Sequence, residues 1–107
     1  MIVNNRPDGE EPGQPPAAEI EAAAREAGLA YRHIPVEPGG LSSDLVQAMA
    51  EAIDEADGTM LAFCRSGTRS TYLWALARSQ QGTPGDELIE RAAAAGYDLS
   101  PLARFFR

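Results

Sequence analysis

The stretch Thr59-Met60-Leu61-Ala62-Phe63-Cys64-Arg65-Ser66-Gly67-Thr68-Arg69-Ser70 decides the fold of this chain. Its apolar first part, residues 59–63, is typical of a strand buried on both faces of a parallel sheet. Its polar second part leads into a helix that we expect from about Arg69 to Gln80. A buried strand that passes through a short polar turn directly into a helix indicates an α/β protein.

The single cysteine, Cys64, lies where this strand ends and the helix begins. A helix N-terminus presents unpaired N–H groups and the positive end of the helix dipole, so it favours an anion. Thiolates in such places have pKa values of roughly 3.5 to 7.5, and Arg65 and Arg69 add positive charge. We therefore interpret Cys64 as a nucleophile in an anion-binding loop. The alternative is an inert structural cysteine followed by a polar turn.

The rest of the loop supplies candidate substrate-binding groups. We expect its backbone N–H groups and the Arg69 guanidinium to hold a tetrahedral oxyanion above the sulfur. The candidate substrate-binding residues in the loop are Arg65, Ser66, Gly67, Thr68 and Ser70. The two serines either donate hydrogen bonds to the sulfur or only cap the helix, and Arg65 either stabilises the thiolate or faces solvent.

Length and composition limit the class of protein. The 107 residues are enough for one domain, residues 1–107, with a single core. A net charge of −7 argues against nucleic acids and anionic membranes as partners. One cysteine leaves no internal disulfide framework, and neither a signal peptide nor a membrane span is recognisable. We expect a cytoplasmic protein.

Strands and helices alternate along the whole chain. The expected elements are a strand at 1–4, a turn-rich loop at 5–16, a helix at 17–27, a strand at 30–36, a helix from 42 or 43 to 55, the strand at 59–63, the helix at 69–80, a helix from a capping box at 83–86 to Gly96, and a short helix from 100. This order predicts a three-layer α/β fold whose mainly parallel sheet is flanked by helices. Ligands bind beyond the carboxyl ends of such strands, so the loops after Asn4, Val36 and Phe63 should meet there.

Four polar residues are expected near the Cys64 loop at this edge: Asn5, Arg6, Asp8 and Glu37. Asp8 is the candidate general acid, with a turn-forming Asp-Gly as the alternative. Arg6 either adds positive charge for a substrate or fixes its own loop by pairing with Glu10.

The remaining candidates are interpreted as structural. His33 is the only histidine, and strand alternation favours a partly buried structural role over a catalytic pair with Cys64. Trp74, Phe105 and Phe106 are interpreted as core residues. No group of residues in the sequence has metal-ligand spacing, and no cofactor is indicated.

These segments resemble known families. The residues from Cys64 to Ser70, after a hydrophobic strand, resemble the active-site loop of rhodanese-type sulfurtransferases, where the cysteine carries a persulfide. The wider chain resembles the beta-lactamase-hydrolase-like, phosphatase-like domains, which occur alone or fused to persulfide-dioxygenase-like enzymes of the beta-lactamase fold. The matching segments are 4–10, 31–36, the Cys64 loop with 73–76, and 93–99.

The resemblance implies a fold similar to dual-specificity phosphatases, that is, protein-tyrosine-phosphatase-like of the phosphotyrosine phosphatase II type. The related domains usually carry another strand and helix before the segment that begins here at Met1, so we expect an N-terminally short version. The uncovered edge or apolar face would then be covered by a second copy in a homodimer or by a persulfide-dioxygenase-like partner, unless the true start of the chain lies upstream of Met1.

Three departures from the phosphatase pattern bear on mechanism. Those phosphatases have five residues between the cysteine and the arginine, whereas Cys64 and Arg69 enclose four. Phe63 stands where they usually have histidine, and Pro38 stands where they have the general-acid aspartate. Phosphate-ester hydrolysis needs such an acid, whereas sulfur transfer does not, because sulfite and persulfide leave as stable anions. The helical C-terminal half, in contrast, is phosphatase-like.

We therefore weigh three functions. The leading hypothesis is a sulfurtransferase in which Cys64 forms a persulfide from thiosulfate or a persulfide donor and passes sulfur to a thiol or cyanide. The alternative is a phosphatase that acts on phosphate esters through a phosphocysteine, with Asp8 as acid. The third is a non-catalytic module that binds small anions.

Overall fold

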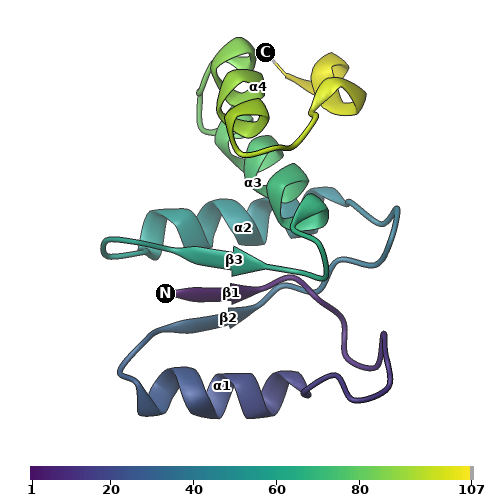
Figure 1. Cartoon of the computed structure of the whole chain (residues 1–107). Helices are drawn as coiled ribbons and strands as arrows, with labels where there is room; N and C mark the ends of the chain where they lie inside the picture. The colour runs from purple at the N-terminus through teal and green to yellow at the C-terminus, as the bar shows by residue number, and fades with distance from the viewer. Residues whose placement is uncertain (107) are drawn as a thin grey trace.

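A parallel sheet of three short strands lies at the centre of the computed structural model, which describes residues 1–106 (Figure 1). The strands are β1 (Ile2–Asn4), β2 (Tyr31–His33) and β3 (Leu61–Phe63), in the order β2-β1-β3. Central β1 pairs with both neighbours in parallel. The carboxyl ends of all three strands therefore lie at one edge of the sheet, on the right in Figure 1, as the sequence predicts.

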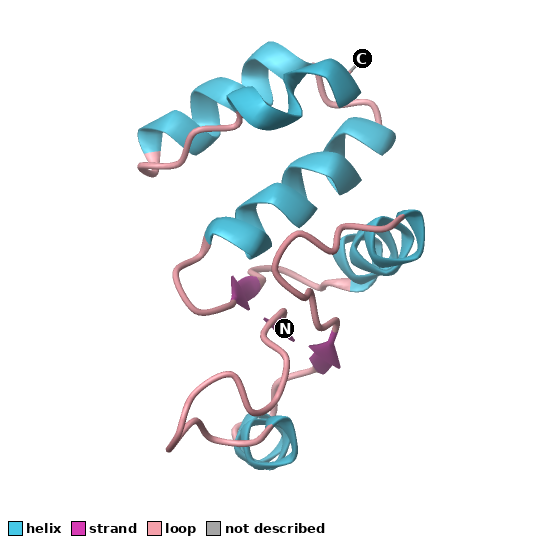
Figure 2. Cartoon of the chain, turned by 90° about the vertical axis from the view of Figure 1, so that its right-hand side faces the viewer, coloured by secondary structure: helices cyan, strands magenta, loops and turns pink. Residues whose placement is uncertain are grey.

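Helices cover both faces of this sheet. Helix α1 (Ala17–Glu26) lies on one face, and α2 (Ser43–Glu55) and α3 (Thr68–Gln80) lie on the other (Figure 2). Helix α4 (Gly85–Ala94) and the 3₁₀ helix η1 (Ser100–Phe105) pack against α3. The α/β arrangement is confirmed, and α4 with η1 adds a layer to the three that the sequence predicts.

Two apolar cores share helix α3. The first core lies between the sheet and the helices α2 and α3, and its buried members are Val3, Ile34, Val36, Met49, Ala50, Ala52, Leu73 and Ala77. The second joins α3 to α4 and η1 through Ala75, Leu88, Ala92, Leu99 and Leu102. Because apolar side chains leave α3 on opposite sides, packing holds this helix from both sides. The loop that precedes α3 therefore has a fixed end.

The helix boundaries follow the sequence at most positions. Ser42 caps α2, because its side chain accepts a hydrogen bond from the Leu45 N–H at 3.3 Å. Gly96 follows the end of α4 with a φ of 93°, as expected of a helix stop. The predicted capping box before α4 is wrong: Pro84 occupies the cap position, and its side chain has no hydrogen-bonding group.

The strands differ from the prediction in length and burial. The segment predicted as a strand at 30–36 pairs as a strand only at residues 31–33, and the one predicted at 59–63 only at 61–63. Among the described residues β3 has one neighbouring strand, so it is an edge strand, and Leu61 is 59% exposed. The prediction that this run is buried on both faces is therefore wrong.

Two of the residues assigned to the interior lie at the surface. His33 is exposed, with its Nε2 atom 3.1 Å from the Arg6 carbonyl oxygen, and Phe105 is 56% exposed. Trp74 and Phe106 are partly buried against the cores. Within residues 1–106, no helix combines the length and the apolar character that crossing a bilayer requires.

Candidate active site

The Cys64 loop, residues 64–70, leads from the end of β3 into the first turn of α3. Gly67 is the cap residue of α3, and its φ of 93° lies in the left-handed region that favours glycine. The Gly67 N–H donates a hydrogen bond to the Sγ atom of Cys64 at 3.1 Å. The sulfur therefore sits at the N-terminus of a helix, as the sequence predicts.

Several donors surround the half-buried thiol of Cys64. Burial acts to raise the pKa of this thiol, but donors from Ser70, Gly67 and Arg69 outweigh it, so that the pKa lies below its ordinary value. The donors are the backbone N–H groups of all three residues and the Ser70 hydroxyl. That hydroxyl also donates to Asn5 Oδ1 at 2.8 Å. A hydroxyl has one hydrogen, so the backbone N–H groups are the constant donors to the sulfur.

Asn5 connects the three loops at this edge of the sheet. It is fully buried, and its Nδ2 atom donates to the Ile34 carbonyl oxygen at 2.9 Å. Its backbone N–H donates to the Phe63 carbonyl oxygen at 2.7 Å, directly before Cys64. The sequence predicts that Asn5 lies near the Cys64 loop, but only the structure shows that its hydrogen bonds join the three loops.

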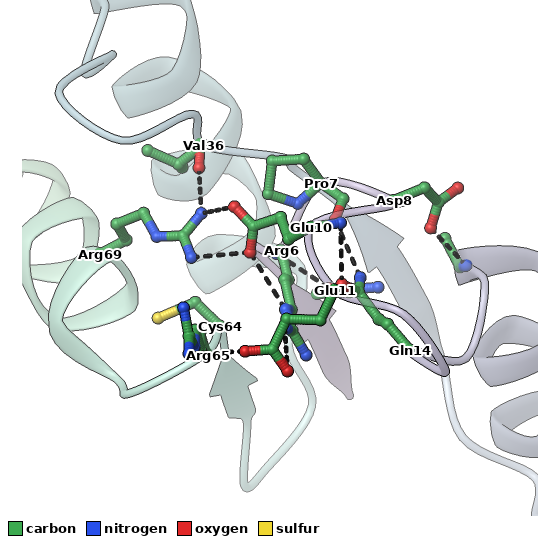
Figure 3. Close-up of polar contacts among 12 residues, drawn as sticks. Arg6, Pro7, Asp8, Glu10, Glu11, Gln14, Val36, Cys64, Arg65 and Arg69 are labelled. Atoms are coloured by element: carbon green, nitrogen blue, oxygen red, sulfur yellow. Dashed lines mark hydrogen bonds and ion pairs between the residues drawn. The ribbon is translucent and has the colours of Figure 1, made fainter.

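Arg69 is held by two acceptors from other loops (Figure 3). Its Nη1 atom donates to Glu10 Oε2 and to the Val36 carbonyl oxygen, both at 2.7 Å, and its Nη2 atom donates to Glu10 Oε1 at 2.9 Å. The hydrogen bonds to Glu10 raise the pKa of Arg69. The Arg69 hydrogen bond, supported by Arg6, lowers the pKa of Glu10 to about 2, against an opposing effect of burial. Both groups are therefore charged at neutral pH.

These two residues begin a chain of alternating charges, which we call the ion-pair chain: Arg69, Glu10, Arg6, Glu11 and Arg65. Arg6 Nε lies 3.0 Å from Glu10 and Arg6 Nη2 lies 3.5 Å from Glu11, which is 2.6 Å from Arg65. The chain thus connects both arginines of the Cys64 loop through the loop at residues 5–16 (Figure 3). Of the two roles weighed for Arg6, the pairing with Glu10 is confirmed.

Asp8 belongs neither to this ion-pair chain nor to the surroundings of Cys64. Its Oδ1 atom accepts a hydrogen bond from the Ala17 N–H at 2.7 Å, which satisfies the start of α1. Figure 3 shows its carboxylate directed away from Cys64, on the far side of Glu10. The expectation that Asp8 lies beside Cys64 is wrong, because its loop directs it to the helix. Glu10, two residues later, is the carboxylate that reaches Arg69.

The remaining loop residues bond mainly to one another. The Ser66 hydroxyl donates to Thr68 Oγ1 at 3.3 Å, and the Tyr97 hydroxyl donates to the Ser66 carbonyl oxygen at 2.9 Å. Arg65 faces solvent while it pairs with Glu11. Tyr97 was not identified from the sequence. The substrate-binding roles of these loop residues stay predictions.

A groove of about 570 Å³ lies behind the loop, between β3, α2, α3 and α4, and it touches Gly67, Ser70 and Tyr97. Its lining includes neither Cys64 nor Arg69. In the part of the chain that the structure describes, no three His, Cys, Asp or Glu side chains lie together as a metal site would require. Cys64, its backbone N–H donors and Arg69 form the candidate anion site. This set suits nucleophilic attack on a tetrahedral anion.

Comparison with known sequences identifies relatives that cover most of this chain. Residues 1–83 match the family described as beta-lactamase hydrolase-like protein, phosphatase-like domain. The beta-lactamase hydrolase-like protein of Xylella fastidiosa (strain Temecula1) is 43% identical over 99 residues, which are 92% of this chain and 23% of that protein. Its counterpart in Agrobacterium fabrum is 34% identical over 105 residues, 97% of this chain and 24% of that protein. The chain therefore spans about a quarter of the length of these curated relatives.

Solved structures give the fold independently. A candidate phosphatase from Neisseria meningitidis is similar with a TM-score of 0.80 and 38% identity, and the match covers 96% of this chain and 73% of that one. A candidate phosphatase (DUF442) from Shewanella putrefaciens matches with a TM-score of 0.67 over 97% of this chain and 64% of that one; at 19% identity it shows the fold alone. The descriptions of the matched family and of the Neisseria structure name a phosphatase, so they favour the phosphatase alternative over the sulfurtransferase hypothesis. The chain belongs to the family of phosphatase-like domains of beta-lactamase hydrolase-like proteins.

Proposed function

We propose that this chain is a cysteine-dependent phosphatase domain acting on small phosphate esters. The Cys64 thiolate attacks phosphorus, the bond to the ester oxygen breaks, and an alkoxide or phenolate leaves from the phosphocysteine and takes a proton from water. Water then attacks phosphorus, which releases phosphate and restores the thiolate. The observation that carries the proposal is the Cys64 sulfur at the N-terminus of α3, with hydrogen-bond donors that lower its pKa and Arg69 beside it. The family membership supports it.

The carboxylates near the site limit which esters this domain hydrolyses. Asp8 is engaged at α1, and the low pKa of Glu10 keeps that residue ionised, so neither is placed to give a proton to a departing alkoxide. A phenolate leaves more readily than an alkoxide without a proton donor, because its negative charge is delocalised over the ring. We therefore expect aryl phosphates to be hydrolysed faster than alkyl phosphates.

The test is turnover of a small aryl phosphate by the wild type, Cys64→Ser and Asp8→Asn. Cys64→Ser should abolish turnover, because a serine hydroxyl is not ionised at this site. Asp8→Asn retains the oxygen that caps α1 and should keep turnover within about twofold of the wild type. Wild-type turnover no faster than that of Cys64→Ser would contradict the proposal. A large loss in Asp8→Asn would restore Asp8 as the acid.

A second candidate is sulfur transfer, favoured by the four residues between Cys64 and Arg69 and by the position of Asp8 away from the sulfur. Here Cys64 attacks the outer sulfur of thiosulfate, the sulfur–sulfur bond breaks, and sulfite leaves as an anion. A thiol or cyanide then takes the terminal sulfur from the persulfide. Intact-mass spectrometry after mixing with thiosulfate distinguishes the candidates. One added sulfur atom on the wild type and none on Cys64→Ala, without phosphatase turnover, would select sulfur transfer.

A further inference from the structure

We propose that Glu10 is the positioning residue of Arg69: it holds one edge of the guanidinium so that the other edge faces an anion bound at Cys64. The inference rests on the anion-binding role of the Cys64 loop proposed above, and it holds for either group transferred. It concerns a residue in another loop, 59 positions away in the sequence.

The hydrogen bonds of Arg69 show which edge of its guanidinium remains for an anion. A guanidinium has five N–H donors. Glu10 and the Val36 carbonyl oxygen engage both donors of Nη1 and one of Nη2. The Nε–H and the second Nη2–H have no hydrogen-bond partner within residues 1–106. These two form a parallel pair, the geometry that binds two oxygens of a tetrahedral anion.

The Cys64 sulfur lies on the side of that remaining edge. Figure 3 shows Glu10 beyond the outer end of the guanidinium, and the sulfur below its Nε and Nη2 atoms. The negative charge of Cys64 also raises the pKa of Arg69, which requires the two groups to be close. Glu10 therefore occupies the edge of Arg69 that an anion at Cys64 would not use.

Glu10 is fixed well enough to orient a neighbour. Its side chain is only 16% exposed, and Arg6 Nε donates to the same carboxylate at 3.0 Å. Its backbone N–H donates to Gln14 Oε1 at 3.1 Å, and Gln14 Nε2 donates to the Pro7 carbonyl oxygen at 2.9 Å. These bonds tie the loop at residues 5–16 to itself, so the carboxylate does not depend on Arg69 for its place.

A competing interpretation makes Glu10 an inhibitory carboxylate that only neutralises Arg69. The two interpretations predict opposite signs. If Glu10 only neutralises charge, its replacement by glutamine removes a negative charge beside the site and strengthens anion binding. If Glu10 positions Arg69, the same replacement loosens the guanidinium and weakens anion binding.

The experiment measures the affinity for inorganic phosphate by titration calorimetry at fixed ionic strength. We expect Glu10→Gln to weaken phosphate binding about tenfold, as for loss of a well-aligned charge-assisted hydrogen bond. Glu37→Gln is the matched control, because it removes the same charge from near Arg69 without removing a hydrogen bond to the guanidinium. It should bind phosphate as tightly as the wild type or more tightly. Equal or tighter binding by Glu10→Gln would overturn the proposal.

Two further measurements keep the test decisive. Glu10→Asp retains the charge but shortens the side chain, so positioning predicts weaker phosphate binding, whereas neutralisation predicts no change. The pH dependence of Cys64 alkylation needs no phosphate: Glu10→Gln should shift its midpoint upward if Arg69 moves away and downward if only charge is lost. A wild type that fails to bind phosphate contradicts the proposed function, while the alkylation midpoint still decides the role of Glu10.

Discussion

At the scale of single residues, the ionisation of Cys64 depends on one turn of backbone. Its sulfur accepts from N–H groups of the first turn of α3, and those donors do not titrate. Ser70 is the exception, because its hydroxyl is shared between the sulfur and the buried Oδ1 atom of Asn5. Substitution of Ser70 should therefore change the pKa of the Cys64 thiol with the least effect on the backbone.

Ser70→Ala should raise the pKa of Cys64, because the thiolate loses a donor. We expect alkylation of Cys64 at neutral pH to slow by about three- to tenfold, the effect of one hydrogen bond to a charged group. The measurement is the rate of iodoacetamide alkylation against pH. Ser79→Ala is the control, a buried serine of the same helix that does not act on the sulfur. Equal rates in the wild type and Ser70→Ala would contradict this role.

The sequence predicts the local part of this site and not the distant part. Cys64, Gly67 and Arg69 are identifiable because one strand-to-helix turn holds them together. Asp8 and Glu10 lie in the same loop, and which of them reaches the site depends on the turn at Gly9, whose φ is 75°. Backbone turns of this kind in a loop rich in proline and glycine leave no periodic signal in the sequence.

At the scale of elements, the start of α3 is clamped from two sides. The ion-pair chain holds the Cys64 loop on one side, and Tyr97, which follows α4, bonds to the Ser66 carbonyl oxygen on the other. A Cβ atom at Gly67 would lie 2.0 Å from the Tyr97 hydroxyl oxygen and 2.8 Å from its Cζ atom. Gly67 is therefore required both for its φ and for the space it leaves. The second requirement was not predictable, because Tyr97 is 30 positions away.

Gly67→Ala should destabilise the fold more than an alanine at a glycine of similar φ with free space. Gly82, at the other end of α3, has a φ of 102° and no neighbour within 4 Å of an added Cβ. We expect Gly82→Ala to lower the free energy of unfolding by about 1 kcal/mol through backbone strain alone. Gly67→Ala adds the overlap with Tyr97, for a total of about 2–4 kcal/mol. Urea denaturation measures both, and equal losses would contradict the packing argument.

At the scale of the whole molecule, three loops that follow the three parallel strands meet around one charged network. Asn5 joins these loops by uncharged hydrogen bonds, and Glu10 joins them by ion pairs through Arg69, which also bonds to the Val36 carbonyl oxygen. The alternation of strands and helices predicted this meeting place from the sequence. It did not predict that the sheet ends at β3 within the described residues, because an apolar run does not distinguish an edge strand from a central one.

Because Glu10 links the loops, its titration should make the stability of the fold depend on pH. Its pKa falls from 4.5 to about 2 on folding, so the stabilisation is fully present above 4.5 and is lost as the pH falls toward 2. The free energy of unfolding in urea should therefore fall more steeply over this range for the wild type than for Glu10→Gln. Glu21→Gln, which removes an exposed carboxylate paired with Arg25 on α1, should keep the wild-type slope. If the free energy of unfolding fell equally steeply with pH in all three proteins, the Glu10–Arg69 pair would not hold the loops together in solution. Another residue would then have to position Arg69.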